Sequence, residues 1–393
     1  MTICCTVCEG SSLKRSLDLG RQPPSNRFLL TGSQGEEERY WISLGYCDDC
    51  GTVQLVDRMP IEAIRPRFDW LANSEPEGHL DDLTEILIAL PGISADARIL
   101  GTSYKDQSTL ERFSQRKFRQ VAAVKTDDLS AGSPPFGLET LQHSLSDTAV
   151  IDTLRNRYGA TDILLVRHMV EHAESAVRFL GALRGLLAPG GYMVIEFPDS
   201  ERVLRRAHHA FVWEEHFSYF TETTFRNLAN RVGATVVRCE RYHYPFEDAL
   251  VAILRFDSNT PALSEPRCGT LADLQAFATS YPVEQTRWHT TLSSLKASGE
   301  KLAVFGAGHL AVKLINFMGL TPFIGCVIDD HPKKTGLRMP GSHLPIVPTS
   351  ELAARNIRTC ISTLSPESEI RVRQKLTDYF QAGGRFIPAF PVT

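Results

Sequence analysis

The stretch DILLVRHMVEHAESAVRFLGALRGLLAPGGYMVIE, residues 162–196, contains two predicted strands joined by a predicted helix. Residues 162–166 and 192–196 are short apolar runs with the length of a buried strand. Strands that alternate with helices predict an α/β fold with a parallel sheet covered on both faces. Ligands of such sheets bind at the carboxyl ends of the strands. The helix is predicted from apolar side chains at helical spacing, at Val177, Phe179, Leu180, Leu183 and Leu186. Pro189-Gly190-Gly191 after it is a predicted turn.

The same alternation continues on both sides of this stretch. Upstream, residues 97–101 and 121–124 are predicted strands, and a helix is predicted at 110–116 between them. Downstream, residues 235–238 and 250–254 are predicted to close the sheet as antiparallel strands. We therefore expect a central domain over residues 65–256.

Nine cysteines are unevenly distributed, and five of them lie within the first 50 residues. Cys5 and Cys8 form one CxxC pair, and Cys47 and Cys50 form a second. Each pair can present two thiolates to one tetrahedral ion, so the four residues predict a structural zinc site. Disulfides or a redox pair are the alternatives, and an intracellular chain disfavours disulfides. The predicted zinc-binding domain covers residues 1–64.

A nucleotide-binding pattern begins near residue 301. Residues 301–305 are a predicted strand, and Gly306-Ala307-Gly308-His309-Leu310-Ala311 follows as GxGxxA at a predicted helix start. Phe323 to Asp330 is the next predicted strand, and it ends in two acids at the interval that dinucleotide-binding folds use. Alone, this pattern favours a nicotinamide enzyme. However, only half of a dinucleotide-binding sheet fits before Thr393.

The segment between these two domains is predicted to be a helical connection. Residues 257–268 are rich in Ser and Pro, and a helical stretch follows from Leu271 to Leu295. Pro282 is expected to divide that stretch. We therefore expect a connection at 257–300 and a partial Rossmann-like α/β domain at 301–393.

The segment Trp213-Glu214-Glu215-His216-Phe217-Ser218-Tyr219-Phe220 places a Glu-His pair among aromatic side chains. Desolvation and a neighbouring carboxylate can bring the pKa of a histidine close to the working pH, where it serves as a general base. The alternative is a structural histidine bonded to a neighbour. We take the pair as a candidate proton-transfer site.

Composition narrows the class of partner. The 393 residues are 42% hydrophobic and carry a formal charge of −4, so the chain has no general attraction to nucleic acid or anionic membranes. A small-molecule partner is expected. Residues 1–5 lack a basic region followed by an apolar one, and no apolar run approaches the length of a membrane span. We expect a cytoplasmic protein.

Three motifs of the central domain resemble those of S-adenosylmethionine-dependent methyltransferases: His168 to His172 before a helix, residues 186–191 before a strand, and Glu215-His216. With the two CxxC pairs, the segment Asp18-Leu19-Gly20-Arg21-Gln22-Pro23 and the C-terminal domain, nearly the whole chain resembles the three-part sugar C-methyltransferases. The resemblance implies a Rossmann-like class I methyltransferase sheet that uses S-adenosylmethionine, between the zinc-binding domain and a substrate-binding domain. It also implies methylation of carbon 3 in a 4-keto-deoxysugar carried on a nucleoside diphosphate.

The resemblance also implies catalytic roles. Carbon becomes nucleophilic only after a base removes the proton alpha to the ketone, and the family assigns that base to the position of His216. Glu215 is expected to orient the ring and stabilise its cation, and His172 to donate to the enolate oxygen. The family usually has tyrosine where this chain has Trp213, which lacks the phenolic hydroxyl. We therefore expect Tyr219 or His172 to replace that hydroxyl, or the substrate to differ.

The cofactor loop departs from the family pattern. It reads Gly101-Thr102-Ser103-Tyr104-Lys105-Asp106-Gln107-Ser108, with one glycine where such enzymes usually have a glycine-rich turn. The resemblance places cofactor contacts at Gly101, Asp106 and His168, and ribose contacts at Asp127 or Asp128.

The C-terminal helix start is expected to face a sugar diphosphate. The expected substrate contacts are Trp213, Tyr219, Gly306, Gly308 and His309. The alternative for the two glycines is a tight turn and close packing without a ligand.

Two further functions stay in consideration. The C-terminal pattern alone favours an NAD-dependent oxidoreductase of a sugar nucleotide, and the short C-terminal sheet argues against it. The altered loop after Gly101 favours a non-methylating relative that binds a sugar nucleotide, and the retained Glu215-His216 pair argues against that.

Overall fold

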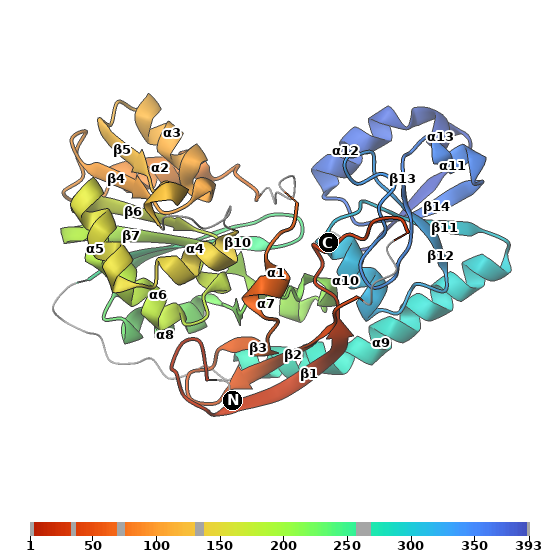
Figure 1. The fold of residues 1–393 in the computed structure, drawn as a ribbon, viewed down its shortest axis with the longest axis horizontal. Coiled ribbons are helices and arrows are strands. Elements are labelled where there is room, and N and C mark those ends of the chain that lie inside the picture. The colour runs from red at the N-terminus through yellow and green to blue at the C-terminus, as the bar shows by residue number, and fades with distance from the viewer. Residues whose placement is uncertain (1–3, 33–36, 69–74, 130–136, 257–268, 391–393) are drawn as a thin grey trace.

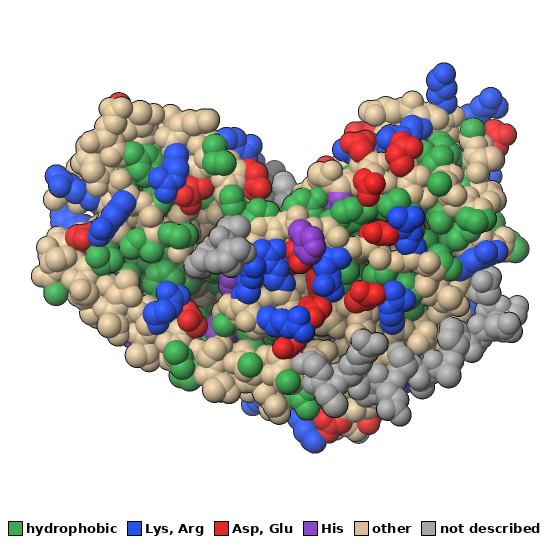
Figure 2. Space-filling view, turned by 180° about the vertical axis from the view of Figure 1, so that it is seen from behind, with side chains coloured by type: hydrophobic (Ala, Val, Ile, Leu, Met, Phe, Trp, Pro, Cys, Tyr) green, Lys and Arg blue, Asp and Glu red, His purple; other side chains and the backbone are tan. Residues whose placement is uncertain are grey.

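The computed structural model describes residues 4–32, 37–68, 75–129, 137–256 and 269–390. It confirms the α/β class, with three sheets of four, six and five strands. The six-stranded and five-stranded sheets form two lobes, and the four-stranded sheet lies below and between them (Figure 1). From behind, the space-filling surface is hollowed between the two lobes (Figure 2).

The N-terminal sheet is antiparallel and has the order β1-β2-β3-β8. Its strands are β1 (Leu13–Gln22), β2 (Tyr40–Cys47), β3 (Val53–Asp57) and β8 (Ser218–Tyr219). Strand β8 comes from the central part of the chain, directly after the predicted proton-transfer segment. The N-terminal sheet therefore holds that segment by backbone pairing.

The central sheet has the order β5-β4-β6-β7-β10-β9. The first four strands are parallel, and β10 and β9 are antiparallel additions, as predicted. The strands are β4 (Arg98–Gly101), β5 (Gln120–Ala123), β6 (Thr161–Arg167), β7 (Leu187–Asp199), β9 (Thr235–Tyr242) and β10 (Asp248–Arg255).

Both faces of this sheet are covered, because alternate side chains of a strand point to opposite faces. Ile163 and Leu165 of β6 join one core cluster, which α2 (Leu80–Ile88) and α3 (Gln107–Gln115) cover. Leu164 and Val166 join the other. That second cluster is covered by α5 (Thr148–Tyr158), α6 (Ala176–Leu183) and α8 (Glu222–Arg231). The shorter helices are α1 (Ile61–Ile64), α4 (Leu138–Ser144) and α7 (Ser200–Arg205).

Strand β7 begins earlier than the sequence indicated. Pro189, Gly190 and Gly191 were expected as a turn, and they lie inside the strand. Gly190 has a φ of +78°, and a Cβ on Gly191 would lie 2.7 Å from the Thr161 carbonyl oxygen. The glycines therefore let β7 bend while it stays close to β6.

The C-terminal sheet is parallel, with the order β13-β12-β11-β14-β15. Its strands are β11 (Lys301–Phe305), β12 (Ile324–Ile328), β13 (Ile346–Val347), β14 (Ile357–Ser362) and β15 (Arg385–Pro388). The helices are α10 (His309–Phe317), α11 (Glu351–Ala354), α12 (Pro366–Lys375) and α13 (Thr377–Gln381).

The long helix α9 (Gly269–Ala297) runs beneath the molecule and leads into the C-terminal sheet (Figure 1). The prediction that Pro282 divides this stretch is wrong, because the helix continues through it. Buried side chains anchor the helix on both sides of the proline, Leu274 and Phe277 before it and Trp288 and Leu292 after it. Their packing compensates for the lost backbone hydrogen bond. The first part of the predicted connection, 257–268, lies outside the described residues.

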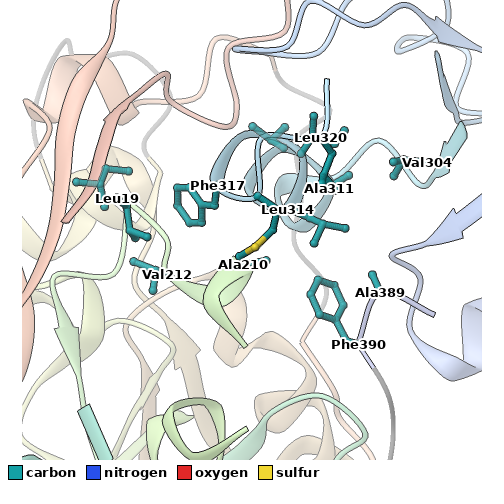
Figure 3. Packing of buried hydrophobic residues seen from close by; sticks show 14 of the residues in the cluster. Leu19, Ala210, Val212, Val304, Ala311, Leu314, Phe317, Leu320, Ala389 and Phe390 are labelled. Atoms are coloured by element: carbon teal, nitrogen blue, oxygen red, sulfur yellow. The ribbon is translucent and has the colours of Figure 1, made fainter. Parts of the chain in front are cut away.

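Helix α10 is the element around which the three modules pack. Its residues Ala311, Leu314 and Phe317 share one buried cluster with Leu19 of β1 and Val212 of the central module (Figure 3). A backbone pair between Leu29 and Arg338, with N–O distances of 3.0 and 2.9 Å, also joins the N-terminal and C-terminal modules directly. The three modules therefore share one core.

A buried ion pair crosses the same junction. Lys313 of α10 is 1% exposed, and its ammonium pairs with Glu214, which is fully buried. Ser25 of the N-terminal module donates to the same carboxylate from its backbone nitrogen, at 2.5 Å, and from its hydroxyl, at 2.8 Å. Burial alone would raise the pKa of Glu214, but Lys313 and Ser25 lower it. One carboxylate thus binds groups from two other modules.

No helix in the described part of the chain combines the length and the apolar character needed to cross a membrane.

Candidate active site

A cavity of about 910 Å³ lies between the modules. All three contribute to its wall. The N-terminal module provides Ser25, Asn26 and Phe28, the C-terminal module includes Gly308, His309, Lys334, Ser368 and Arg371, and the central module includes Glu75, Lys105, His168, Glu171, His172, Trp213, Glu215 and His216.

The predicted proton-transfer segment is held rigidly at the cavity wall. The backbone nitrogen of Phe217 donates to the Glu171 carbonyl oxygen at 2.7 Å. The Tyr219 hydroxyl accepts from the Trp213 nitrogen at 2.8 Å and donates to the Trp213 carbonyl oxygen at 3.1 Å. Tyr219 therefore closes the loop on itself, and the cavity wall does not include it. It is not placed to replace the family's tyrosine.

Two imidazoles face each other in the cavity. The ring centroids of His172 and His216 are 4.8 Å apart, with planes 88° apart. Burial, together with the positive charge of Lys105, lowers the pKa of His172 to about 3. Burial and the neighbouring His172 lower the pKa of His216 to about 3. Both rings are therefore neutral near pH 7. The expectation that the surroundings bring the pKa of His216 close to the working pH is wrong, because burial and His172 hold that pKa well below it.

The carboxylate that lies beside these two rings is that of Glu171. One ligand atom each from Glu171, His172 and His216 lie within 4.8 Å of one another. Glu215, which was expected to orient His216, accepts a hydrogen bond from the Asn26 amide at 3.1 Å. Glu215 thus connects the loop to the N-terminal module.

Trp213 forms part of the cavity wall. Its indole stacks on the His309 ring, with centroids 4.6 Å apart and planes 16° apart. The indole nitrogen donates to the Ser25 hydroxyl at 3.1 Å, so Trp213 is fixed from both other modules.

At the cofactor edge of the sheet, Gly101 and Asp106 build the loop rather than line the cavity. The Asp106 carboxylate accepts from the backbone nitrogens of Thr102 at 2.7 Å, Ser103 at 2.9 Å and Arg167 at 3.1 Å. Burial raises the pKa of Asp106 to about 7. A Cβ on Gly101 would lie 2.7 Å from the Asp106 Cβ, so only glycine permits this close approach.

Lys105, Glu75 and His168 are charged groups of the cavity wall at this edge. The Lys105 ammonium pairs with Glu75 at 3.0 Å. Burial alone would lower the pKa of His168, but the carboxylates of Glu75, Glu196 and Glu171 raise it to about 10. His168 is therefore a cation near neutral pH, with its Nε2 3.0 Å from Glu196.

The acids after β5 do not line the cavity. Asp127 is exposed to solvent, and Asp128 accepts from the Tyr158 hydroxyl and pairs with Arg157 at 2.5 Å. The structure thus separates the expected ribose contacts from the other predicted site residues.

The two glycines of the C-terminal helix start differ in role. Gly306 has a φ of +97°, and a Cβ there would lie 3.0 Å from the Thr363 hydroxyl, so it serves the turn and close packing. Gly308 borders open space and lines the cavity beside His309. The Asp329 carboxylate accepts from the Ala307 nitrogen at 2.9 Å and pairs with Lys334 at 3.2 Å.

The four predicted zinc ligands come together away from the cavity. Sγ atoms of Cys5 and Cys50 are 3.4 Å apart, those of Cys8 and Cys47 are 3.5 Å apart, and all four lie within 4.8 Å of one another. Thiolates around a tetrahedral zinc with Zn–S bonds of about 2.3 Å are about 3.8 Å apart. The donor set and spacing therefore fit zinc.

Sequence reasoning missed several residues of the site. Lys313 left a signal, because it is the one charge in the apolar run Leu310 to Ile315. Glu171 lies within the His168 to His172 motif, but the motif alone predicts no role for it. Glu75, Lys105 and Ser25 left no signal, because only the folded chain brings them to the cavity.

We expect Cys47→Ser to remove the bound zinc, because three thiolates and a hydroxyl bind it more weakly. Elemental analysis of the purified protein should fall from about one zinc per chain to near zero. Cys4→Ser is the matched control and should keep its zinc, since Cys4 lies outside the cluster. Zinc retained by Cys47→Ser, or lost by Cys4→Ser, would contradict the assignment.

Acidification should destabilise the fold through His172. Its folded pKa of about 3 is below the unfolded value near 6.5, so the unfolded chain binds more protons and stability falls as the pH drops below 6.5. Between pH 7.5 and 5.5 the free energy of unfolding should fall by about 1 kcal/mol through His172 alone. In His172→Asn the free energy of unfolding should therefore fall by that amount less than in wild type. Denaturant unfolding at both pH values measures it.

The matched control is His143→Asn, which changes an exposed histidine outside the cavity and should unfold like wild type at both pH values. Equal pH dependence in His172→Asn and wild type would show that His172 titrates normally in the fold.

Comparison with known proteins agrees with this architecture. Residues 5–64 match the family model "Putative zinc binding domain", residues 72–238 match "Methyltransferase domain", and residues 264–391 match "C-methyltransferase C-terminal domain". Over 401 residues the chain is 22% identical to C-methyltransferase NovU of Streptomyces niveus. The alignment covers 98% of this chain and 95% of that protein.

Solved structures give weaker likenesses. A 1,6-didemethyltoxoflavin-N1-methyltransferase of Burkholderia thailandensis is 17% identical, covers 46% of this chain and 80% of its own, and has a TM-score of 0.29. An O-methyltransferase family protein of the same organism is 12% identical, covers 45% and 56%, and has a TM-score of 0.27. Scores this low carry no argument. The family matches do: the chain is a methyltransferase, and the three matched domain models follow one another along nearly its whole length.

Proposed function

We propose that this protein transfers a methyl group from S-adenosylmethionine to a carbon beside the ketone of a nucleoside-diphosphate keto-deoxysugar. The observation that carries the proposal is the cavity itself. Its wall holds two neutral imidazoles beside a carboxylate, and it also includes the starts of helices α10 and α12. Proton abstraction and anion binding are thus available within one enclosed space.

His216 is the base. A carbon-bound proton beside a ketone is weakly acidic, so its removal needs a neutral base held against the substrate. His216 is neutral because of its burial, and its loop is fixed by Phe217 and Tyr219. When the ring takes the proton, the Glu171 carboxylate stabilises the imidazolium.

His172 holds the oxygen that becomes negative. It lies next to His216 in the cavity, and its Nδ1 has no hydrogen-bond partner among the described residues. The tautomer that carries the proton on Nδ1 donates to the enolate oxygen. This replaces the hydroxyl that is lost because Trp213 stands where the family usually has tyrosine. The stacked Trp213 and His309 rings form a flat apolar wall for the sugar.

The cavity also fits S-adenosylmethionine. Its amino-acid end is a zwitterion, and the paired side chains of Lys105 and Glu75 offer one group of each charge at the cofactor edge. Tyr104 and His168 line the same edge. When bound, the cofactor supplies an electrophilic methyl group.

The diphosphate binds along the part of the cavity wall that the C-terminal module provides. The starts of α10 and α12 both face the cavity, through Gly308 and through Ser365 and Ser368. Helix starts favour anions, and Lys334 and Arg371 add positive charge there. The nucleoside diphosphate is thus held mainly by the C-terminal module.

The C-terminal module does not favour a nicotinamide cofactor. In dinucleotide-binding folds the acid after the second strand binds a ribose. Here the Asp329 carboxylate is occupied by Ala307, by His331 and by Lys334. Binding of S-adenosylmethionine distinguishes our proposal from the alternative of a non-methylating protein. A ligand that binds only the folded state raises its stability, so binding can be read from the melting temperature. S-adenosylmethionine should raise the melting temperature, and NAD should not.

We expect His216→Gln to lower kcat for methyl transfer by about 10²- to 10⁴-fold, because the variant lacks the general base. The dissociation constant for S-adenosylmethionine should stay within about threefold of wild type, since the change lies outside the cofactor edge. Mass spectrometry of thymidine-diphosphate and uridine-diphosphate 4-keto-6-deoxyhexoses measures the methylation.

His289→Asn is the control, because that ring bonds the Met318 carbonyl oxygen outside the cavity. Its methylation rate should match wild type. Wild-type turnover by His216→Gln would require another base. Binding of S-adenosylmethionine without methylation of either sugar would reject the substrate class.

A further inference from the structure

Glu171, His172 and His216 form a compact donor set at the cavity wall. One nitrogen or carboxylate oxygen from each lie within 4.8 Å of one another. Glu171 and His172 are each 2% exposed, and His216 is half-buried. The hydrogen bond from the Phe217 nitrogen to the Glu171 carbonyl oxygen, 2.7 Å long, ties together the two segments that carry the donors. The set is therefore preorganised.

Several of these donor atoms have no partner in the protein. Both carboxylate oxygens of Glu171 and the Nδ1 of His172 are buried without a hydrogen bond from any described residue. The Nδ1 of His168 lies 3.5 Å from the Oε1 of Glu171. Buried polar atoms are normally bonded, so these point to an absent ligand.

The chemistry of the set selects the ligand. Two imidazoles and one carboxylate are the ligands of many zinc sites with an open fourth position, and they also suit cobalt and nickel. Magnesium and calcium prefer oxygen-only sets. All three side chains line the cavity, so an ion can enter and its remaining positions face open space. Two cations lie nearby: the Lys105 ammonium pairs with Glu75 at 3.0 Å, and the protonated His168 contacts both Glu171 and Glu196.

We propose that Glu171, His172 and His216 bind one divalent transition-metal ion of the zinc, cobalt or nickel class. The ion binds in the space where the keto substrate is deprotonated. The effect of metal binding on catalysis rests on the proposed function: a metal on His216 occupies the lone pair that would take the proton. The metal is therefore an inhibitor that competes with the keto substrate.

Titration with cobalt chloride tests binding on the full-length protein with its cysteine site filled by zinc. Without S-adenosylmethionine or sugar, one further cobalt per chain should bind with visible absorption and no sulfur-to-cobalt charge-transfer band. Glu171→Gln and His172→Asn should each weaken this binding about tenfold or more. His143→Asn, outside the cavity, should bind like wild type.

Two results would overturn the proposal: no cobalt beyond the cysteine site, or equal affinity in wild type and both site variants. Glu171→Asp is the control for misfolding. It keeps a carboxylate and should restore much of the cobalt binding lost in Glu171→Gln.

Because absorption is read without substrate, failure of the proposed function leaves this result intact. Inhibition then tests the consequence. Added zinc should raise KM for the keto sugar and leave kcat unchanged, and lower kcat at constant KM would reject competition.

Discussion

The carboxylate of Glu214, buried against Lys313 and Ser25, is the interaction on which the arrangement of the three modules depends. Two charges removed from water are stable only when they stay together, so each module must hold its position for the pair to exist. The surrounding apolar cluster on α10 excludes water and keeps the attraction strong. Glu214 directly precedes Glu215 and His216 in the chain. The same contact that joins the modules therefore also places His216, the proposed base.

This coupling explains why the active site is built from three pieces. Ser25 and Asn26 approach from the N-terminal module. The Trp213 indole donates a hydrogen bond to Ser25, and Glu215 accepts one from Asn26. His309, at the start of α10, stacks on Trp213 from the other side. The N-terminal module, with its cysteine cluster, thus braces the loop that carries His216. The cavity between the packed domains brings two imidazoles and one carboxylate together for the proposed chemistry.

Much of this could be predicted from local sequence. The strands of the central sheet, the cysteine cluster and the candidate histidines follow from apolar periodicity, CxxC spacing and a Glu-His pair. Prediction failed where distant contacts outweigh local preference: packing of Phe277 and Trp288 carries α9 through Pro282, and Gly190 bends a strand where a turn was expected. The expected roles of Asp106 and Tyr219 were displaced by hydrogen bonds to nearby backbone. Glu75 and Ser25 reach the cavity only through tertiary structure.

A double-mutant cycle on the buried pair tests the central claim most directly. Glu214→Gln, Lys313→Met and the double variant are compared with wild type by denaturant unfolding. Removal of one partner leaves a buried charge and should cost about 3–5 kcal/mol, whereas the double variant should cost clearly less than the two single losses added. A coupling of about 2 kcal/mol or more is the predicted result. Additive losses within about 0.5 kcal/mol would contradict the view that this pair holds the three modules together.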